Sequence, residues 1–295
     1  MTKDTAAPTR DISYAYSAAS RGGRALIRLM ENSTGRLGLI RRASGYETEM
    51  QGGRCFFDVM ADRYGLSLEV TRGSQANIPR HGPVIVIANH PYGILDGLML
   101  GRMLSQARGD FRIVAHSVFG RAPDLGKHLL PISFGEDKAA LALNIQSRKT
   151  ALDYLGQGGA IGIFPGGTVS TAAKPFSKPM DPVWRSFTAR MIAKSEATVV
   201  PVFFDGHTSR MFQIASHLHS TLRMGLLIKE FRKRVDTPVR VAIGAPITRD
   251  ILNPLAKDSK AMMDFLRKAT YELSAEPDLA CELGFEFEER HRAAR

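Results

Sequence analysis

Short apolar runs alternate with longer segments of helical periodicity along most of this sequence. The runs have the length of single strands and cover residues 84–88, 111–115, 160–164, 198–204 and 239–243. Between them, apolar residues recur at helical spacing over about 96–107, 138–156, 182–195, 209–233 and 259–274. Strands that alternate with helices are typical of βαβ units. The sequence therefore predicts an α/β fold with a central, largely parallel (mixed) sheet flanked by helices.

The composition of the runs indicates which of the predicted strands are buried and which lie at an edge. Nearly continuous Val and Ile, as in V-I-V-I-A at 84–88, suits strands that are covered on both faces. Pro201 falls inside the run 198–204. Because proline has no N–H to give to a β-ladder, it favours an edge strand or a bulge at that position.

The N-terminal part of the chain follows a different pattern. Residues 1–20 are polar and small, and we expect them to form a mobile tail. From Arg24 to Arg42, leucine and isoleucine mix with arginine, which predicts a basic amphipathic segment of one or two helices, broken near Asn32–Gly35. We therefore divide the chain into a tail with helices at residues 1–65 and an α/β domain at residues 66–295.

Unusual loops follow three of the predicted strands. N-H-P-Y-G comes after the run 84–88, P-G-G-T-V-S-T occupies 165–171, and D-G-H-T-S occupies 205–209. In an open α/β sheet, ligands bind beyond the carboxyl ends of parallel strands. If these strands are parallel neighbours, the three loops meet at one edge of the sheet and form a site there.

The first loop offers a histidine and a carboxylate. Gly93 lets the chain fold back tightly, so that His90 can meet Asp96 at the first turn of the next helix. A carboxylate bonded to one ring nitrogen fixes the tautomer and makes the other nitrogen a better base, able to take a proton from a hydroxyl. A histidine and an aspartate at short spacing also occur together with no catalytic role, so the position after a buried strand is what favours the chemical interpretation.

The second loop offers backbone N–H groups and hydroxyls. Gly166 and Gly167 expose the backbone, and Thr168 and Ser170 supply hydroxyl groups. Such a loop can bind an anion or a developing oxyanion. An ordinary strand-to-helix turn is the alternative interpretation of a Gly-Gly pair.

Charge and composition limit the classes of molecule that the protein is expected to bind. The formal net charge is +11 and the isoelectric point is about 9.9, which favours contact with an anionic surface, nucleic acid or acidic protein. The two cysteines are too few for a disulfide framework and fit a reducing compartment. We find no signal-peptide pattern and no apolar stretch of about 18 residues. Basic amphipathic segments at 24–42 and 210–234 favour peripheral binding to a membrane, although a solvated helix face gives the same pattern.

Three segments together carry a resemblance to a known family. N-H-P-Y-G-I-L-D-G at 89–97 resembles the Asn-His-x4-Asp motif of the glycerolipid and lysophospholipid O-acyltransferases (1-acylglycerol-3-phosphate acyltransferase-like). F-P-G-G-T-V-S at 164–170 resembles that family's Phe-Pro-Glu-Gly-Thr-Arg-Ser, and V-V-P-V-F-F at 199–204 its Val-Pro-Val strand. Order and spacing agree over about residues 80–250.

The resemblance implies an α/β acyltransferase held at the cytoplasmic face of the inner membrane as a peripheral protein. It implies a lysolipid acceptor and an acyl thioester of acyl carrier protein or coenzyme A as donor, with no bound cofactor, metal or nucleic acid. His90 would be the base and Asp96 its partner. The implied substrate-binding residues are Asn89, Pro91, Tyr92, Gly93, Phe164, Pro165, Gly166, Gly167, Thr168 and Ser170.

The departures from the motifs bear on the acceptor. Five residues separate His90 from Asp96 here, where the family motif has four. The family's Glu and Arg of the second segment are Gly166 and Val169, and P-I-S-F at 131–134 stands where another motif supplies an Arg. Loss of a guanidinium removes a bidentate contact to phosphate. We therefore expect a lyso-aminolipid acceptor of the lyso-ornithine-lipid type, with lysophosphatidic acid as the alternative.

Other classes of protein fit the sequence less well. A lipid-surface hydrolase of the serine type needs a G-x-S-x-G elbow, which does not occur. A metallohydrolase would have to use His217 and His219, which are two apart on a predicted helix. The basic residues are not interleaved with aromatic residues as in single-strand binders, and no nucleotide-binding glycine motif is present.

Overall fold

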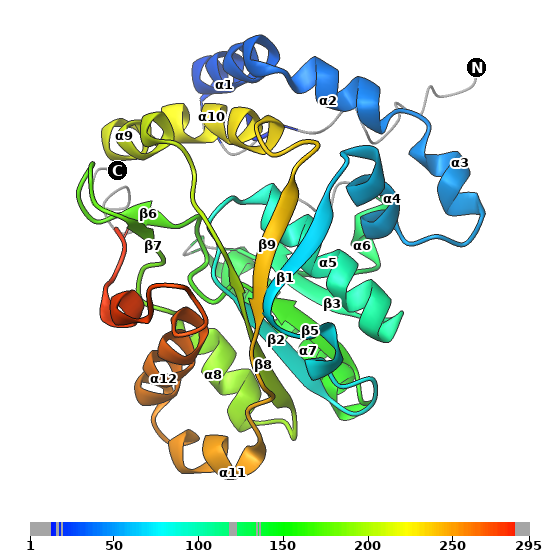
Figure 1. The fold of residues 1–295 in the computed structure, drawn as a ribbon, viewed down its shortest axis with the longest axis vertical. Helices are drawn as coiled ribbons and strands as arrows, with labels where there is room; N and C mark the ends of the chain where they lie inside the picture. Colours follow the sequence, from blue (N-terminus) through cyan, green and yellow to red (C-terminus); the bar gives the residue numbers. More distant parts are fainter. Residues whose placement is uncertain are drawn as a thin grey trace.

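The structure is a computed structural model that describes residues 13–15, 18, 20–117, 123–133, 135 and 137–286. Its centre is a seven-stranded sheet in the order β1-β9-β8-β2-β5-β3-β4 (Figure 1). The strands are β1 Ser67–Gly73, β2 Val84–Ala88, β3 Arg112–His116, β4 Leu129–Ile132, β5 Ala160–Ile163, β8 Thr198–Phe204 and β9 Pro238–Ile243. A separate hairpin is formed by β6 Thr171–Ala172 and β7 Pro179–Met180.

Strand directions bring the predicted loops together. β2 pairs in parallel with both β5 and β8, and β3 pairs in parallel with β4 and β5. β9 runs antiparallel to β8 and parallel to β1, so those two strands run against the others. The carboxyl ends of β2, β5 and β8 therefore meet at one edge, where the loops at 89–93, 164–171 and 205–209 begin.

Helices cover both faces of the sheet, as the sequence predicts. Alternate residues of β2 point to opposite faces. Val84 and Val86 belong to a core cluster with α4 (Phe56–Arg63), α5 (Ile94–Arg108) and part of α10 (Ser220–Arg232). Ile85 and Ile87 join α7 (Lys138–Gly156), α8 (Ser186–Ala193) and α12 (Ser259–Tyr271). The largely parallel, mixed α/β sheet is confirmed.

Some details differ from the prediction. The segment 209–233 forms two helices, α9 (Arg210–Leu218) and α10 (Ser220–Arg232), because His219 is extended and its ring accepts the N–H of Thr221 as an N-cap. α8 begins at Ser186, four residues later than expected, because Asp181–Arg185 wraps back onto the loop at 164–170.

The prediction that Pro201 marks an edge is wrong, whereas the predicted bulge agrees with a shift of register beside it. β8 is an inner strand between β9 and β2. The carbonyl of Pro201 accepts the N–H of Gly244 on the β9 side, beyond the last β8–β9 residue pair at Val202. Pairing resumes at Val199 and Ile247 with the register shifted by one residue, so the missing N–H of Pro201 lies at an irregular part of the ladder.

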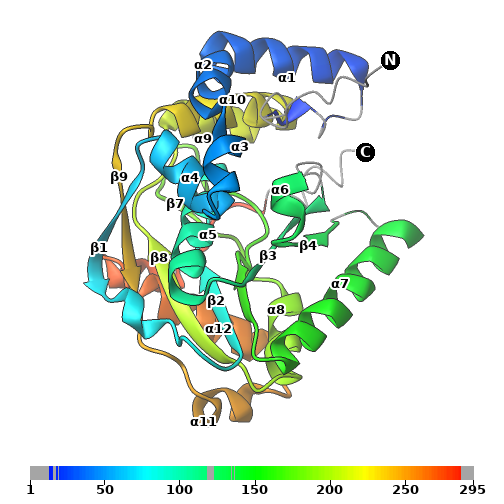
Figure 2. The same cartoon turned by 90° about the vertical axis from the view of Figure 1, so that its right-hand side faces the viewer.

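N-terminal helices cover the edge of the sheet where the strands end. α1 (Arg21–Thr34) and α2 (Arg36–Ala43) lie beyond α10, and α3 (Tyr46–Gln51) leads to α4 (Figures 1 and 2). α1 packs closely on α10 at Gly225, which has no side chain. A Cβ atom at that position would lie 2.8 Å from Met30 Sδ, so the close approach requires glycine. The break between the first two helices falls at Gly35, where φ is +118°, as predicted.

Part of the predicted mobile tail is described and is packed. Ser13 Oγ and the Tyr14 N–H donate to the carboxylate of Glu31, at 2.5 and 2.6 Å. Burial raises the pKa values of Glu31 and of the Tyr14 hydroxyl. For residues 13–15 the expectation of mobility is therefore wrong, and the rest of the predicted tail lies, apart from residues 18 and 20, outside the described residues.

Short helices complete the chain. They are α6 (Pro123–Gly126), α11 (Arg249–Leu252) and the single-turn segments Gln75–Asn77, Asn253–Leu255 and Pro277–Cys281. None of them carries a residue predicted for the site.

Candidate active site

Asn89 joins the ends of two neighbouring strands. Its amide nitrogen donates to the Phe204 carbonyl at 2.9 Å, and its amide oxygen accepts the Phe204 N–H at 2.7 Å. The side chain thus takes the place of a strand neighbour where β2 and β8 end, and it is buried. Both ends of the amide are used in this contact, which fixes the point at which the next residue, His90, leaves the sheet.

His90 and Asp96 face each other across the tight loop. His90 Nδ1 lies 3.0 Å from Asp96 Oδ2, and the His90 side chain is 19% exposed while that of Asp96 is fully buried. The same oxygen accepts the N–H groups of Tyr92 at 2.7 Å and Gly93 at 2.9 Å. The ring N–H points off the line to Oδ2, so the contact is an ion-pair distance with bent geometry. Asp96 Oδ1 is buried and has no hydrogen-bond partner among the described residues.

Opposing effects set the ionisation of Asp96. Burial raises its pKa, because a charged carboxylate is disfavoured away from water. The His90 ring and the two backbone N–H groups act in the opposite direction, with the smaller total effect.

Gly93 makes the loop possible. Its φ is +88°, and a side chain there would meet Val169 Cγ2 at 3.3 Å. The N–H of Gly93 holds Asp96 at the third position of α5, where a carboxylate also interacts favourably with the helix dipole. The extra residue between His90 and Asp96 is thus accommodated by a backbone conformation that glycine favours.

The second predicted loop lies directly beside His90. The imidazole stacks on the Phe164 ring at a centroid distance of 4.2 Å, and the His90 carbonyl accepts the Ser170 N–H at 2.8 Å. The Gly167 N–H closes a turn onto the Phe164 carbonyl at 3.0 Å. Pro165 has no N–H, so Gly166 and Thr168 supply the N–H groups of this turn that have no acceptor among the described residues.

A buried guanidinium braces the same loop. Arg223 of α10 donates to Thr171 Oγ1 at 2.7 Å, to the Val169 carbonyl at 2.7 Å and to Thr168 Oγ1 at 3.1 Å. The side chain is 2% exposed. Sequence reasoning missed this residue, because a lone arginine on a basic helix gives no sign that it points inward.

A buried carboxylate was missed as well. Asp181 is fully buried and accepts the N–H of His90 at 3.2 Å and the indole N–H of Trp184 at 2.9 Å. Ser170 Oγ donates to the same oxygen as His90 does, at 2.5 Å. No motif flagged the segment, and the one available signal was an acid set between apolar residues in P-M-D-P-V-W.

The third loop closes the other side of the site. Tyr92 is buried, its hydroxyl donates to the Asp205 carbonyl at 3.0 Å, and its ring lies under the Arg234 guanidinium at 4.5 Å. Burial raises the pKa of Tyr92 to about 12. Pro91, Pro165 and Gly166 are also buried, so of the predicted residues His90, Phe164, Gly167 and Thr168 are the ones with accessible surface.

Two cavities differ in their relation to this site. A cavity of about 250 Å³ adjoins Phe164 at the carboxyl ends of β3, β4 and β5. It is lined by apolar residues together with Ser133, Asn144, Arg185 and Thr188. Its position at that edge makes it the candidate subsite for a substrate group.

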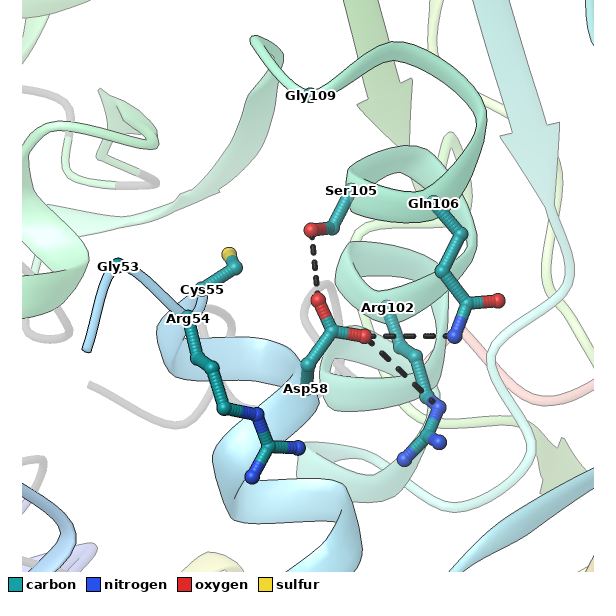
Figure 3. Close-up of a pocket in the computed structure, with 8 residues that line it drawn as sticks. All are labelled: Gly53, Arg54, Cys55, Asp58, Arg102, Ser105, Gln106 and Gly109. Atoms are coloured by element: carbon teal, nitrogen blue, oxygen red, sulfur yellow. Dashed lines mark hydrogen bonds and ion pairs between the residues drawn. The ribbon is translucent and has the colours of Figure 1, made fainter. Parts of the chain in front are cut away.

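The larger cavity, about 490 Å³, lies elsewhere (Figure 3). It sits between α4 and the second half of α5, towards the amino ends of the strands. Asp58 there accepts hydrogen bonds from Ser105 and Gln106 and lies 3.9 Å from Arg102 (Figure 3). Arg54 pairs with Glu49 and Asp62. Because the charged side chains that line it are paired, either with one another or with neighbouring residues, we do not assign it to the chemistry.

The described part of the chain contains neither a cluster of metal ligands nor a membrane-spanning helix. Among the described residues, no group of histidine, cysteine and acidic side chains is arranged to hold a metal ion. His217 Nε2 contacts the Ala172 carbonyl at 2.9 Å, and His219 caps α10. No helix in the described part of the chain has the length and apolar character needed to cross a bilayer.

Comparison with known proteins gives the following similarities. The model of a protein family described as "Acyltransferase" matches residues 53–280, which include the whole seven-stranded sheet and the three loops. Among solved structures, the chain is similar to the 1-acyl-sn-glycerophosphate (LPA) acyltransferase PlsC from Thermotoga maritima, with 13% identity, a TM-score of 0.45, and coverage of 92% of this chain and 87% of that chain. We draw nothing further from so distant a likeness. No curated protein matches the sequence.

Proposed function

Since the chain belongs to the acyltransferase family, we propose that it moves a fatty acyl group from a thioester to the hydroxyl of a lysolipid by His90–Asp96 general-base catalysis. The observation that carries this mechanism is the 3.0 Å approach of His90 Nδ1 to the buried carboxylate of Asp96 at the end of β2. Acyltransferase activity follows from the family, whereas the acceptor, the donor and the catalytic pair are the proposal.

The geometry supports a division of labour in the site. With Nδ1 turned to Asp96, Nε2 is the nitrogen that removes the proton from the acceptor hydroxyl as its oxygen attacks the thioester carbonyl. The bond from oxygen to the acyl carbon forms, the bond from carbon to sulfur breaks, and the thiol leaves with the proton. Backbone N–H groups of Gly166 and Thr168 are placed in the turn beside His90, where they can stabilise the tetrahedral oxyanion.

This mechanism requires no bound cofactor. The acyl thioester of acyl carrier protein or coenzyme A enters as the donor substrate. Residues 164–170 contain two hydroxyls: that of Ser170 is buried and donates to Asp181, and that of Thr168 accepts from Arg223, so both are engaged away from the His90 ring. A covalent acyl-enzyme is therefore not part of the proposal.

The acceptor proposed is a lyso-aminolipid. Val169 stands where the resembled motif has an arginine, and its side chain is buried against α10. This position therefore supplies no guanidinium to the turn. The 250 Å³ cavity beside Phe164 is smaller than the roughly 300–1,000 Å³ of typical whole-ligand pockets, which suits a head group alone.

A side-by-side assay tests the acceptor. The purified protein, supplied with acyl-carrier-protein thioester, is given a lyso-aminolipid in one reaction and lysophosphatidic acid in another. We expect kcat/KM to be at least about tenfold higher with the lyso-aminolipid, since the phosphate would lack its bidentate partner. A clear preference for lysophosphatidic acid would support the phospholipid alternative, and fatty acid released in the absence of either acceptor would support a hydrolase.

α1 and α2, which lie beyond α10 at the same edge of the sheet as the site, carry a surface that suits a membrane. α1 and α2 expose Leu26, Leu29 and Leu37, by 43%, 67% and 55%. The same helices carry the exposed arginines Arg21, Arg24 and Arg41. Both helices lie at the edge of the sheet where the strands end (Figures 1 and 2). Apolar side chains flanked by arginines favour a peripheral position on an anionic bilayer, which we place at the cytoplasmic face of the inner membrane.

Replacement of these leucines tests the membrane contact. Leu26, Leu29 and Leu37 are changed together to serine, and sedimentation with anionic vesicles is measured. Each leucine withdrawn from lipid loses part of the roughly 1.5–3 kcal/mol of its transfer, so we expect binding at least about tenfold weaker. The control variant changes Leu141 and Ile145 of α7, which are exposed by 61% and 52%, to serine. Equal loss in both variants, or in neither, would remove α1 and α2 from this role.

A further inference from the structure

Asp181 links the two loops that the mechanism needs. We infer that it is a positioning residue that holds the loop carrying His90 in register with the turn at 164–170. This inference rests on the proposed function for its catalytic meaning. Asp181 does not touch the reacting atoms, and it belongs to none of the three segments that gave the resemblance.

The contacts of the carboxylate span two strands. One oxygen, Oδ1, accepts both the backbone N–H of His90, which follows β2, and the hydroxyl of Ser170, which follows β5. The other oxygen accepts the indole N–H of Trp184 at 2.9 Å. Because one oxygen accepts a hydrogen bond from each loop, the two loops cannot move apart without breaking one of these hydrogen bonds. The His90 carbonyl and Ser170 N–H add a second, backbone link.

The backbone of Asp181 is itself anchored. Its N–H donates to the Tyr271 hydroxyl at 2.7 Å, and its carbonyl accepts from Arg267 Nη2 at 3.0 Å and from the Gly284 N–H at 2.9 Å. Tyr271 and Arg267 belong to α12, which packs on the opposite face of the sheet from α5. The carboxylate is thus held by the body of the domain.

Packing around the turn agrees with this role. A side chain on Gly166 would meet the carboxyl carbon of Asp181 at 3.3 Å. The motif that residues 164–170 resemble has a glutamate at this position, so in this chain the carboxylate next to the turn comes from a later segment instead. A buried charge is retained in a protein when its hydrogen bonds are satisfied, as they are here.

Three variants separate positioning from general stability. Asp181→Ala removes the link between the loops. Trp184→Phe removes only the third hydrogen bond to the carboxylate and leaves His90 and Ser170 bonded to it. Asp181→Asn combined with Trp184→Phe keeps an amide oxygen for the two loop donors and turns the amide N–H groups towards the phenyl ring, where no donor opposes them.

The expected results follow from the geometry. A misplacement of about 1 Å can cost about 100-fold in rate, so Asp181→Ala should lower kcat by about that factor and change KM for either substrate by less than about threefold. Trp184→Phe should keep kcat within about threefold, and the double variant should recover at least about tenfold over Asp181→Ala, since an amide oxygen accepts the same two bonds. If Asp181→Ala does not fold, Asp181→Asn alone takes its place in the experiment. The amide N–H group of that asparagine must face one of the donors that now bond to the carboxylate, so at least one hydrogen bond is lost.

Amide hydrogen exchange gives a readout that does not depend on activity. In Asp181→Ala the His90 N–H should exchange faster, while the Tyr92 and Gly93 N–H groups, held by Asp96, should keep their protection. If no acceptor is ever acylated, the proposed function fails and exchange still tests the link. Unchanged kcat in Asp181→Ala, an equal loss in Trp184→Phe, unchanged exchange at His90, or a double variant no better than Asp181→Ala would each overturn the inference.

Discussion

His90→Ala is expected to lower acyl transfer by at least about 10³-fold, since a positioned general base contributes roughly 10²–10⁴-fold and no neighbouring side chain can replace it. The nearest ring, Phe164, cannot carry a proton, and Asp96 is buried behind the imidazole. Initial rates of ester formation with the preferred acceptor measure the effect.

The fold should survive this change. His90 is partly exposed and makes its structural bonds through its backbone, to Asp181 and Ser170. The thermal midpoint should shift by no more than a few degrees, and sedimentation with anionic vesicles should be unchanged. His81→Ala, at an exposed histidine in the turn before β2, serves as the matched control. Activity within tenfold of the original would remove His90 from the role of base.

Asp96→Asn is expected to have the second largest effect, a loss of about 10²–10⁴-fold in kcat. Oδ2 of Asp96 accepts the N–H groups of Tyr92 and Gly93 and lies 3.0 Å from His90 Nδ1, so the asparagine must turn its oxygen to them. Its amide nitrogen then occupies the place of Oδ1, which has no partner among the described residues. A buried donor without a partner costs about 1–3 kcal/mol of stability, so the unfolding free energy should fall as well.

The pH dependence supplies a further check on the same pair. Burial raises the pKa of Asp96, so its carboxylate protonates at a higher pH than an exposed one. Protonation of Asp96 removes the negative partner of the base, and kcat/KM should therefore fall as pH falls. Asp205→Asn, at a half-exposed carboxylate paired with Arg240, is the control and should keep activity within about threefold because that group has no place in the proton transfer. A kcat/KM that does not fall towards acidic pH would contradict the assignment of Asp96 as the partner of the base. An equal loss of activity in Asp96→Asn and Asp205→Asn would contradict it as well.

The sequence was sufficient to predict the arrangement of the core. β2, β5 and β8 are continuous apolar runs because both of their faces are covered, and such runs are easily recognised. β1 was missed because it lies at the sheet edge and is mostly exposed, so its residues S-L-E-V-T-R-G show little apolar pattern. β4 was missed because it has four residues and contains Pro131.

The site was predictable only where its residues are neighbours in the chain. The distance from His90 to Asp96 depends on a local loop, and Gly93 gave a visible sign of it. Asp181 and Arg223 reach the same loops from distant segments. Their roles depend on which side chains point inward after folding, and spacing along the chain contains no information on that. Asn89, in contrast, was expected near the substrate, and its amide bonds to Phe204 at the strand ends.

The central claim is that His90 activates an acceptor hydroxyl for direct attack on a thioester. Release of free thiol from acyl-carrier-protein thioester, followed with and without lyso-aminolipid, tests it most directly in the original protein and in His90→Ala. The account predicts rapid thiol release that needs both the lysolipid and His90, with one ester formed for each thiol. Thiol release at the same rate without any lysolipid, or from the protein that lacks His90, would contradict it.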